Sequence, residues 1–219
     1  MRIVCVGYRK WALDIYDEIV KKTKHTTLII RKKSQYNEKA LYDFKPNIIF
    51  FYGWSWTISK NIIDNFVSIM LHPSPLPKYM GGSPLQNQII AGETKSAITL
   101  FRMSNEIDAG NILAQEEISL EGHLSEIFHR ITEVGLRLTI NILENSFTEY
   151  PQDLSKATVF KRRKPEESEI TLEELKNSDA VYLFNKIRML EDPYPNAFIR
   201  TKDGKKLLFK RVELDEDEK

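Results

Sequence analysis

Short apolar runs alternate with longer amphipathic stretches through the first half of the chain. Four runs rich in Ile, Val, Leu and Phe lie at residues 2–6, 26–30, 47–52 and 68–71. Runs of this length and composition are typical of buried strands. Between them, apolar positions at Trp11, Ile15 and Ile19 favour a helix, as does the stretch 58–66. Strands that alternate with helices predict an α/β fold with a parallel sheet.

The pattern changes in the second half. Residues 97–103 and 112–118 read as two strands around a glycine-containing loop, which predicts a hairpin. Residues 83–91 and 124–143 favour helices. The chain then becomes polar and basic over residues 150–168, which indicates a linker. We expect a main domain at 1–150, and a segment at 151–219 with short helices and a second hairpin built from residues 198–212.

Composition limits the classes of function. The 219 residues carry 32 basic and 31 acidic side chains, so the net charge is +1 and gives no reason to expect nucleic-acid or membrane attraction. One cysteine excludes an intramolecular disulfide and a multi-cysteine metal site, and we predict no metal. No run reaches the ~18 apolar residues of a membrane span, and a cytoplasmic location is the default expectation.

The stretch 70–84 carries the first candidate chemistry. The apolar run 68–71 delivers His72 to the end of a predicted strand, and three prolines in the next five residues stiffen the loop. Gly81 and Gly82 permit a turn, and Ser83-Pro84 reads as an N-cap with the first helical residue. Sites of α/β enzymes form at such strand ends. A core histidine beside an ordinary loop explains this stretch equally well.

Other candidates are weaker alone. Gly7 stands without the G-x-G-x-x-G fingerprint, so we propose no dinucleotide. Arg9 and Lys10 at a helix start could hold an anion or could be solvated. The tryptophans at 54 and 56 form either a packing corner or a wall for a flat ligand. Asp108, before Ala-Gly, is by itself a common turn residue.

Taken together, these parts resemble a known family. His-Pro-Ser-Pro-Leu-Pro (72–77), Gly-Gly-Ser-Pro-Leu-Gln (81–86) and Ile-Asp-Ala-Gly-Asn-Ile-Leu (107–113) are similar to the 10-formyltetrahydrofolate-dependent formyltransferases, and residues 187–198 are similar to their segment after the catalytic domain. That resemblance implies a Rossmann-like mixed sheet flanked by helices, with the catalytic domain at 1–150. Residues 52–56 and the short C-terminal hairpin look most like the nucleotide-sugar N-formyltransferases.

The resemblance also implies roles for particular residues. His72 and Asp108 would be catalytic, with the histidine beside the formyl carbon of 10-formyltetrahydrofolate and the aspartate orienting it. The expected folate-binding residues are Trp56, Thr57, Ile58, Ser104, Ile107 and Asp108. The expected substrate-binding residues are Arg9, Lys10, Lys78, Tyr79 and Gln86. The acceptor would be a nucleotide-linked amino sugar, for example a UDP-linked 4-amino-4,6-dideoxy hexosamine. The hairpin packs on the main domain or on a second subunit, so a homodimer stays open.

One position departs from the family. Its motif is Asn-x-His, in which the amide helps to hold the developing oxyanion, and here that position is Met70. A thioether donates no hydrogen bond, and loss of one such donor costs ~10²–10³ in rate unless another group replaces it. Candidates are a backbone N–H, Gln86, Asn87 or Asn105. Two alternatives therefore stay open: a formyl-folate hydrolase, and a degenerate folate- or nucleotide-sugar-binding relative without turnover.

Overall fold

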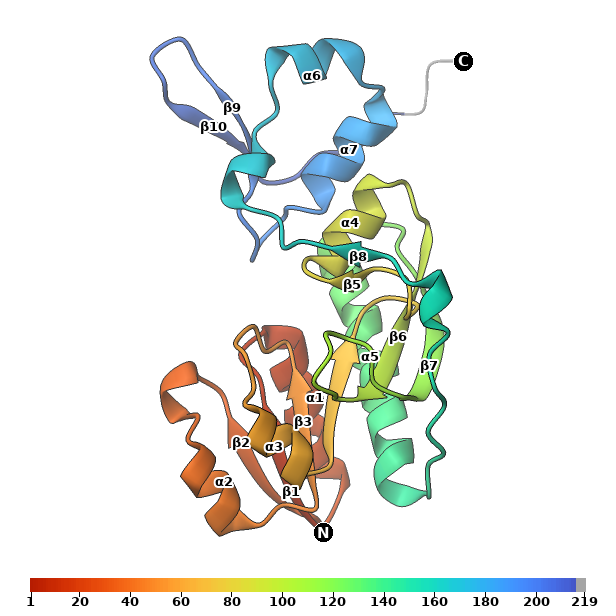
Figure 1. The fold of residues 1–219 in the computed structure, drawn as a ribbon. Helices are drawn as coiled ribbons and strands as arrows, with labels where there is room; N and C mark the ends of the chain where they lie inside the picture. Colours follow the sequence, from red (N-terminus) through yellow and green to blue (C-terminus); the bar gives the residue numbers. More distant parts are fainter. Residues whose placement is uncertain (216–219) are drawn as a thin grey trace.

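A computed structural model describes residues 1–215 and shows one six-stranded mixed sheet with helices on both faces (Figure 1). The strand order is β2-β1-β3-β4-β6-β7. The first four strands are parallel to one another, and β6 pairs antiparallel with both of its neighbours, β4 and β7. The strands are β1 (Arg2–Val6), β2 (Thr26–Ile30), β3 (Ile48–Tyr52), β4 (Ser68–His72), β6 (Lys95–Arg102) and β7 (Ile112–Ser119). The predicted Rossmann-like α/β class is confirmed.

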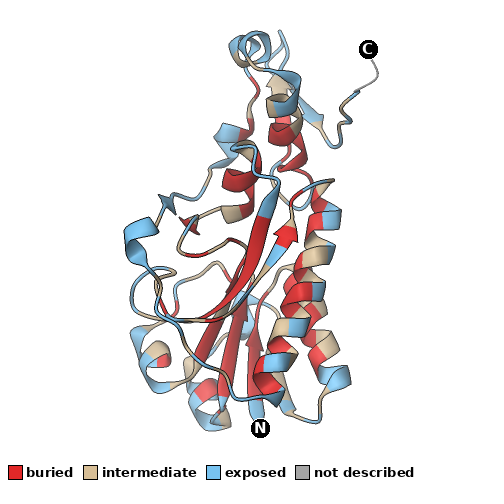
Figure 2. Ribbon diagram, turned by 90° about the vertical axis from the view of Figure 1, so that its right-hand side faces the viewer, coloured by how far each residue is buried: buried red, intermediate tan, exposed pale blue. Residues whose placement is uncertain are grey.

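Alternating side chains of the central strands build two cores. Ile3 and Cys5 of β1 face the helices α1 (Lys10–Lys22) and α5 (Leu124–Glu144). Val4 and Val6 face the other side, where α2 (Glu38–Phe44) and α3 (Lys60–Asn65) lie. Strands buried on both faces read as continuous apolar runs, which is why the sequence reveals them. Figure 2 shows these strands as buried and the outer helix faces as exposed.

Helix α5 approaches the sheet closely because it carries Gly135. A Cβ at this position would lie 2.8 Å from the Leu71 side chain on β4 and 2.9 Å from the Ile15 side chain on α1. The missing side chain therefore lets α5 pack down on both neighbours. This packing supports β4, the strand that ends at His72.

The remaining elements lie beyond one end of the sheet (Figure 1). A two-stranded parallel pair joins β5 (Met80–Gly81) to β8 (Val159–Phe160), and helix α4 (Pro84–Ile90) follows β5. A C-terminal lobe, residues 165–215, contains α6 (Leu172–Asn177), α7 (Ala180–Arg188) and the hairpin of β9 (Ala197–Arg200) and β10 (Lys206–Phe209). The last four residues of the predicted segment 151–219 lie outside the described residues.

Buried polar contacts fasten the C-terminal lobe to the main domain. Arg188 donates hydrogen bonds to the carbonyl oxygens of Leu120 (2.6 Å) and Gly122 (2.7 Å). The Glu191 carboxylate pairs with the His123 ring at 2.6 Å and accepts the backbone N–H of Leu124 at 3.0 Å. These contacts connect the lobe to the start of α5. No helix in residues 1–215 has the length and apolar character needed to cross a bilayer.

Two sequence expectations need comment. Ser83 is the N-cap of α4 and Pro84 its first residue, as predicted, but the Ser83 side chain makes no cap hydrogen bond, because its backbone is left-handed (φ 52°) and its hydroxyl accepts the N–H of Arg163 at 3.1 Å. The predicted linker 150–168 packs along the main domain, because Tyr150 bridges to Ile112 and Phe160 pairs with Gly81. The domain division at residue 150 stays a prediction.

Candidate active site

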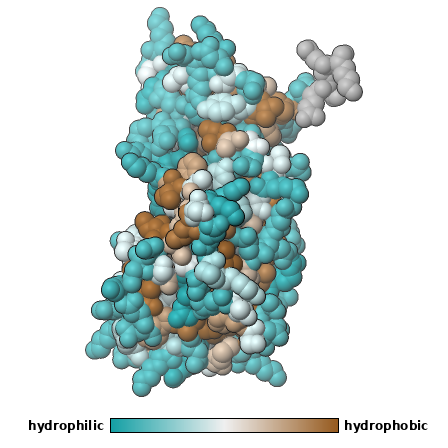
Figure 3. Space-filling view, turned by 45° about the vertical axis from the view of Figure 1, so that its right-hand side comes forward, coloured by the Kyte–Doolittle hydropathy of each residue, from teal (hydrophilic) through white to brown (hydrophobic). Residues whose placement is uncertain are grey.

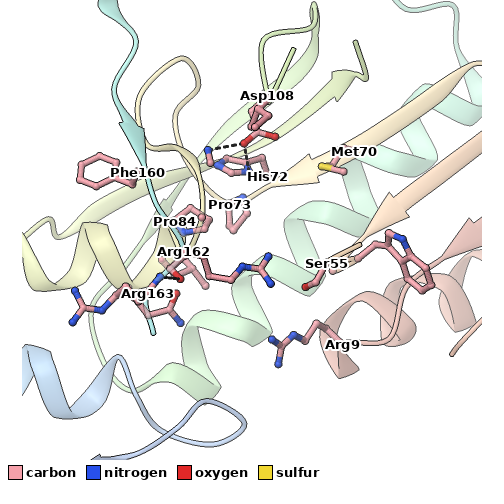
Figure 4. A pocket seen from close by; sticks show the side chains of 18 of the residues that line it. Arg9, Ser55, Met70, His72, Pro73, Pro84, Asp108, Phe160, Arg162 and Arg163 are labelled. Carbon is pink, nitrogen blue, oxygen red and sulfur yellow. Dashed lines mark hydrogen bonds and ion pairs between the residues drawn. The ribbon is translucent and has the colours of Figure 1, made fainter. Parts of the chain in front are cut away.

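A cavity of about 880 Å³ opens at the carboxyl ends of β1, β3 and β4. Ligands of open α/β sheets bind at this edge. Figure 4 shows side chains from the sheet, from the loops after it and from the segment that contains β8 pointing into the cavity. The predicted residues that line it are Arg9, Trp56, Thr57, His72, Gln86, Ile107 and Asp108.

His72 is held in one orientation. Its side chain is buried, with the residue 5% exposed, and its Nε2–H donates to the carbonyl oxygen of Tyr79 at 2.9 Å. Because a carbonyl oxygen only accepts, the neutral ring carries its proton on Nε2 and its lone pair on Nδ1. Nδ1 lies 3.6 Å from Oδ2 of Asp108. The basic nitrogen of the neutral ring therefore faces the carboxylate.

The loop after His72 is stiffened by hydrogen bonds as well as by prolines. The hydroxyl of Thr99 on β6 donates to the carbonyl oxygen of Ser74 at 2.6 Å, and the hydroxyl of Ser74 donates to the carbonyl oxygen of Lys78 at 2.8 Å. Gln88 on α4 donates to the carbonyl oxygen of Pro73 at 2.9 Å. These bonds fix the Tyr79 carbonyl that selects the tautomer of His72.

Asp108 links the two loops of the site. Its Oδ2 accepts the backbone N–H of Gly81 at 2.7 Å, and its side chain is only 10% exposed (Figure 4). Its backbone is left-handed (φ 52°), a conformation that non-glycine residues adopt at a cost of about 1 kcal/mol or more. Gln152 steadies this turn by donating to the carbonyl oxygens of Asp108 (2.8 Å) and Gly110 (2.7 Å).

Met70 lines the cavity, in the middle of β4. Its half-buried side chain packs against Phe101 and offers no hydrogen-bond donor there. Among the three amides considered above, Asn87 donates to the carbonyl oxygen of Gly82 at 2.9 Å, and Asn105 lies outside this cavity. Gln86 lines the cavity, and its buried Nε2 makes no hydrogen bond of ordinary length, although the side chain lies close enough to the Tyr194 hydroxyl to lower the pKa of that group. Of these side chains, Gln86 is the one that lines the cavity.

An aromatic wall closes one side of the cavity. The rings of Trp54 and Trp56 lie 4.5 Å apart and that of Tyr8 lies 4.9 Å from Trp56. Tyr8 and Ser55 share a hydrogen bond of 2.8 Å that fixes the turn. The indole N–H of Trp54 is buried and unpaired. This wall can take a flat heteroaromatic ligand.

Five predicted binding residues lie outside the cavity lining, and each is a correction of placement. Lys10 is exposed and pairs with Asp14 at 2.7 Å. Ile58 is buried in the core beneath the wall, because its side chain packs with Ile62. The others are Ser104 on a separate surface hollow, the exposed Lys78, and Tyr79.

Tyr79 acts through its backbone and braces a neighbour. Its carbonyl orients His72, its ring stacks on Phe160 at 5.1 Å, and its hydroxyl donates to Glu93 at 2.9 Å. Burial, reinforced by the carboxylate of Glu93, raises the pKa of Tyr79 to about 12. The hydroxyl therefore stays protonated across the physiological range.

Sequence reasoning missed a group of lining residues around β8. Phe160, Lys161, Arg162 and Arg163 all contribute to the cavity. The basic run was visible in the sequence, but its position was not. A pair of two-residue strands far apart in the chain leaves no periodicity to detect.

Comparison with known proteins places the fold. The model of a family described as formyl transferase matches residues 7–142, which is more than half of the chain. The chain belongs to the formyl transferase family. It is 36% identical over 161 residues to the methionyl-tRNA formyltransferase of Sulfurimonas denitrificans, which covers 72% of this chain and 50% of that protein. The chain spans about half the length of the curated relatives it matches.

Solved structures extend the similarity across the whole chain. A methionyl-tRNA formyltransferase from Clostridium thermocellum superposes with a TM-score of 0.90 and 32% identity, covering all of this chain and 95% of that one. A sugar N-formyltransferase from Shewanella shares the fold at a TM-score of 0.76 and 16% identity, over 98% of both chains. HypX from Aquifex aeolicus, in complex with tetrahydrofolic acid, superposes with a TM-score of 0.80 and 21% identity, covering 95% of this chain and 37% of that one.

Proposed function

We propose that this member of the formyl transferase family transfers a formyl group from 10-formyltetrahydrofolate to a primary amine. The observation that carries the proposal is the buried pair of His72 and Asp108, with Nδ1 and Oδ2 3.6 Å apart in the family's cavity. HypX has the same fold, and its complex with tetrahydrofolic acid supports folate as the formyl carrier.

The geometry supports a division of labour between the two side chains. The amine attacks the formyl carbon, and the carbonyl oxygen of the tetrahedral intermediate becomes negative. Nδ1 of His72 accepts the proton that the amine must lose, because Nε2–H is committed to Tyr79. Asp108 then stabilises the imidazolium. The bond from carbon to the folate nitrogen breaks, and that nitrogen receives the proton.

The folate and the oxyanion have separate candidate partners. The pterin ring lies in our proposal against the wall of Trp54 and Trp56, beside Thr57 and Ile107, all of which line the cavity. Met70 cannot stabilise the oxyanion. Gln86 is our candidate for this role, because it lines the same cavity and its Nε2 makes no hydrogen bond of ordinary length.

For the acceptor we propose a nucleotide-linked amino sugar, with a UDP-linked 4-amino-4,6-dideoxy hexosamine as the specific candidate. The supporting observations are the resemblance of residues 52–56 to the nucleotide-sugar N-formyltransferases and the fold shared with the sugar N-formyltransferase from Shewanella. A methionyl-tRNA acceptor is the second candidate, because the methionyl-tRNA formyltransferases are the more similar in sequence.

The test is incubation with 10-formyltetrahydrofolate and a panel of UDP- and dTDP-linked amino sugars, with methionyl-tRNA in parallel. Mass spectrometry should detect one added formyl group on a nucleotide sugar. Release of formate without any acceptor identifies the hydrolase alternative and overturns the proposal. Folate binding without any turnover identifies the degenerate relative and equally overturns it.

We also propose that two copies of the chain associate through the C-terminal hairpin. Leu207 and Leu208 on β10 are 55% and 49% exposed, although β10 is an apolar strand. The hairpin packs into the lobe through Ala197 and Phe198 of β9, which are buried, and the two leucines of β10 remain as exposed apolar side chains. Sedimentation should give a dimer for the wild type and a monomer for the Leu207→Lys variant, whereas a monomeric wild type contradicts the assignment.

A further inference from the structure

Two arginines from distant parts of the sequence reach into the active-site cavity without a carboxylate partner. Arg9 precedes α1, and Arg162 follows β8 (Figure 4). The guanidinium of Arg9 lies over the rings of Tyr8 at 4.9 Å and Tyr194 at 5.2 Å. Within residues 1–215, neither arginine makes an ion pair of 4 Å or less. Their donors are therefore available to a ligand.

The charge of the lining is strongly unbalanced. It contains the cations Arg9, Lys161, Arg162 and Arg163, and Asp108 is the one carboxylate among the lining residues of the described chain. Asp108 is occupied with His72 and Gly81. Arg163 has a carboxylate at 4.0 Å, on Glu167. An anion at Arg9 and Arg162 would offset the repulsion of these cations.

Tyr194 shows that the two free cations face a common place. Burial raises the pKa of its hydroxyl, whereas a hydrogen bond with Gln86 and, more weakly, the positive charges of Arg9 and Arg162 act in the opposite direction. Both guanidinium groups are thus close enough to the same buried hydroxyl to influence it. Tyr194 itself lines the cavity.

Arg162 is positioned by the loop that follows His72. We refer to residues 158–163 as the basic segment. Gly82 donates its N–H to the carbonyl oxygen of Phe160 at 2.8 Å, and a Cβ on Gly82 would lie 2.3 Å from Cα of Arg162. The neighbouring Gly81 binds Asp108. The separation between Arg162 and the formyl-transfer centre is therefore fixed by a short, rigid stretch of backbone.

We propose that Arg9 and Arg162 bind the diphosphate of the nucleotide-linked acceptor, and that Phe160 stacks on its base. Guanidinium groups bind phosphate oxygens in a bidentate manner, and two of them suit a diphosphate. Phe160 lines the same cavity with its ring 37% exposed and supported from behind by Tyr79. The subsite rests on the proposed function for its acceptor, and it replaces Lys10, which is tied to Asp14.

The test measures ligand binding and needs no turnover. Inorganic pyrophosphate and UDP are titrated by calorimetry, without folate, into the wild type and into Arg9→Gln, Arg162→Gln and Phe160→Ala. Each arginine variant should bind both probes at least about tenfold more weakly, the usual effect of losing a hydrogen bond from a charged group. Phe160→Ala should weaken UDP while leaving pyrophosphate unchanged, because only UDP carries a base.

Lys164→Gln is the matched control, since it removes the same charge two residues away and outside the cavity lining. It should bind both probes like the wild type, and Arg162→Lys should recover part of the binding. The inference is overturned if the wild type binds neither probe, or if Arg162→Gln stays within twofold of Lys164→Gln. It is also overturned if Arg162→Gln weakens binding of uncharged tRNA while UDP does not bind. Formyl transfer is measured in a separate assay. Transfer by a wild type that binds neither probe would overturn the subsite alone, whereas absence of transfer would overturn the proposed function.

Discussion

At the scale of single residues, the orientation of His72 depends on one hydrogen bond, to a backbone carbonyl that takes no part in the proposed reaction. The Tyr79 carbonyl accepts Nε2–H of His72 and so leaves Nδ1 as the basic atom of the neutral ring. In this arrangement the aspartate faces Nδ1, which accepts the proton in our proposal. In that proposal the negative charge of Asp108 acts after proton transfer, when the ring becomes positive.

Replacement of Asp108 by asparagine tests this role. Asp108→Asn keeps the size of the side chain and an oxygen that can accept the Gly81 N–H, but it removes the charge that stabilises the imidazolium. We expect kcat to fall about 10²–10⁴-fold, the usual contribution of acid–base machinery, with little change in folate affinity. Stopped-flow kinetics and folate titration check this. An unchanged kcat would show that the carboxylate has only a structural role.

The replacement at Met70 leads to a paired experiment. If Gln86 supplies the missing donor, Gln86→Leu should lower kcat about 10²–10³-fold. In that background Met70→Asn should recover part of the loss, since it restores an amide on β4 facing the cavity. Circular dichroism controls for folding. A Gln86→Leu variant with wild-type kcat rules Gln86 out and leaves a backbone donor as the alternative.

At the residue scale, recognisable motifs singled out His72 and Asp108, and the structure brings the two side chains together. Their catalytic role stays a prediction. The sequence could not show whether Ile58 lines the cavity or lies in the core, because a single apolar residue in a loop fits either position. Sequence reasoning also placed Lys10 beside Arg9 at the site, although a lysine followed four positions later by Asp14 on a helix forms an ordinary surface pair.

At the scale of elements, the short pair of β5 and β8 organises the site. It joins the His72 loop to the basic segment, and Gly81 in β5 also binds Asp108. The sequence predicted the long strands well because their apolar runs are bounded by polar residues. The pair was not predictable, because its partners are separated by 79 positions and its register depends on tertiary contacts.

Gly82→Ala tests this junction. The new Cβ would lie 2.3 Å from backbone atoms of Arg162, so the two segments must separate. We expect a loss of about 1–3 kcal/mol in the free energy of unfolding and faster amide exchange at residues 158–163. Gly92→Ala is the control, because it sits at φ 82° with no atom within 4 Å. It should cost stability without faster exchange there. Equal rates of amide exchange at residues 158–163 in the two variants would contradict the proposed role of Gly82 in joining these segments.

A second element contact, between α6 and α7, is sensitive to pH. Lys186 donates to both carboxylate oxygens of Glu174 at 2.6 Å, and the two side chains are 6% and 19% exposed. Burial alone raises the pKa of Glu174, but hydrogen bonds from Lys186 and Tyr182 outweigh it and hold the pKa below the ordinary 4.5. The pair therefore contributes stability that is present above about pH 4.5 and lost as the pH falls further.

Glu174→Gln should accordingly lower the free energy of unfolding by about 1–3 kcal/mol at pH 7, and the difference from wild type should shrink as the pH falls below 4.5. Thermal unfolding across that range measures it. Glu117→Gln is the comparison, because Glu117 pairs with Lys95 on the surface with both side chains more than half exposed. It should cost less than about 1 kcal/mol. Equal costs would mean that burial of the pair adds nothing.

At the scale of the whole molecule, the α/β body and the C-terminal lobe meet at the end of the sheet where the cavity lies (Figure 1). Tyr194 and Pro195, beyond α7, line the cavity together with residues of the sheet loops. On the face shown in Figure 3, apolar side chains come to the surface in the middle of the molecule, and hydrophilic ones cover much of both ends. The lobe thus contributes to the site as well as extending the chain.

The fold class and the succession of strands and helices along the chain could be anticipated from periodicity and from the family's motifs, since both are local signals. The participation of residues 159–163 and 194–195 in one cavity could not, because it depends on how separate segments dock. The acceptor is the property least accessible from sequence. In our proposal this docked surface binds the acceptor, whereas the motifs around His72 and Asp108 form the formyl-transfer centre.

The most direct test of the account follows the formyl carbon itself. Isotopically labelled 10-formyltetrahydrofolate is mixed with the protein and a UDP-linked amino sugar, and NMR reports where the label goes. The account predicts that the label appears as a sugar formamide with the wild type and stays on folate with His72→Ala, in a variant that still binds folate. Label that appears as free formate with the wild type, or transfer at an unchanged rate by His72→Ala, would contradict it.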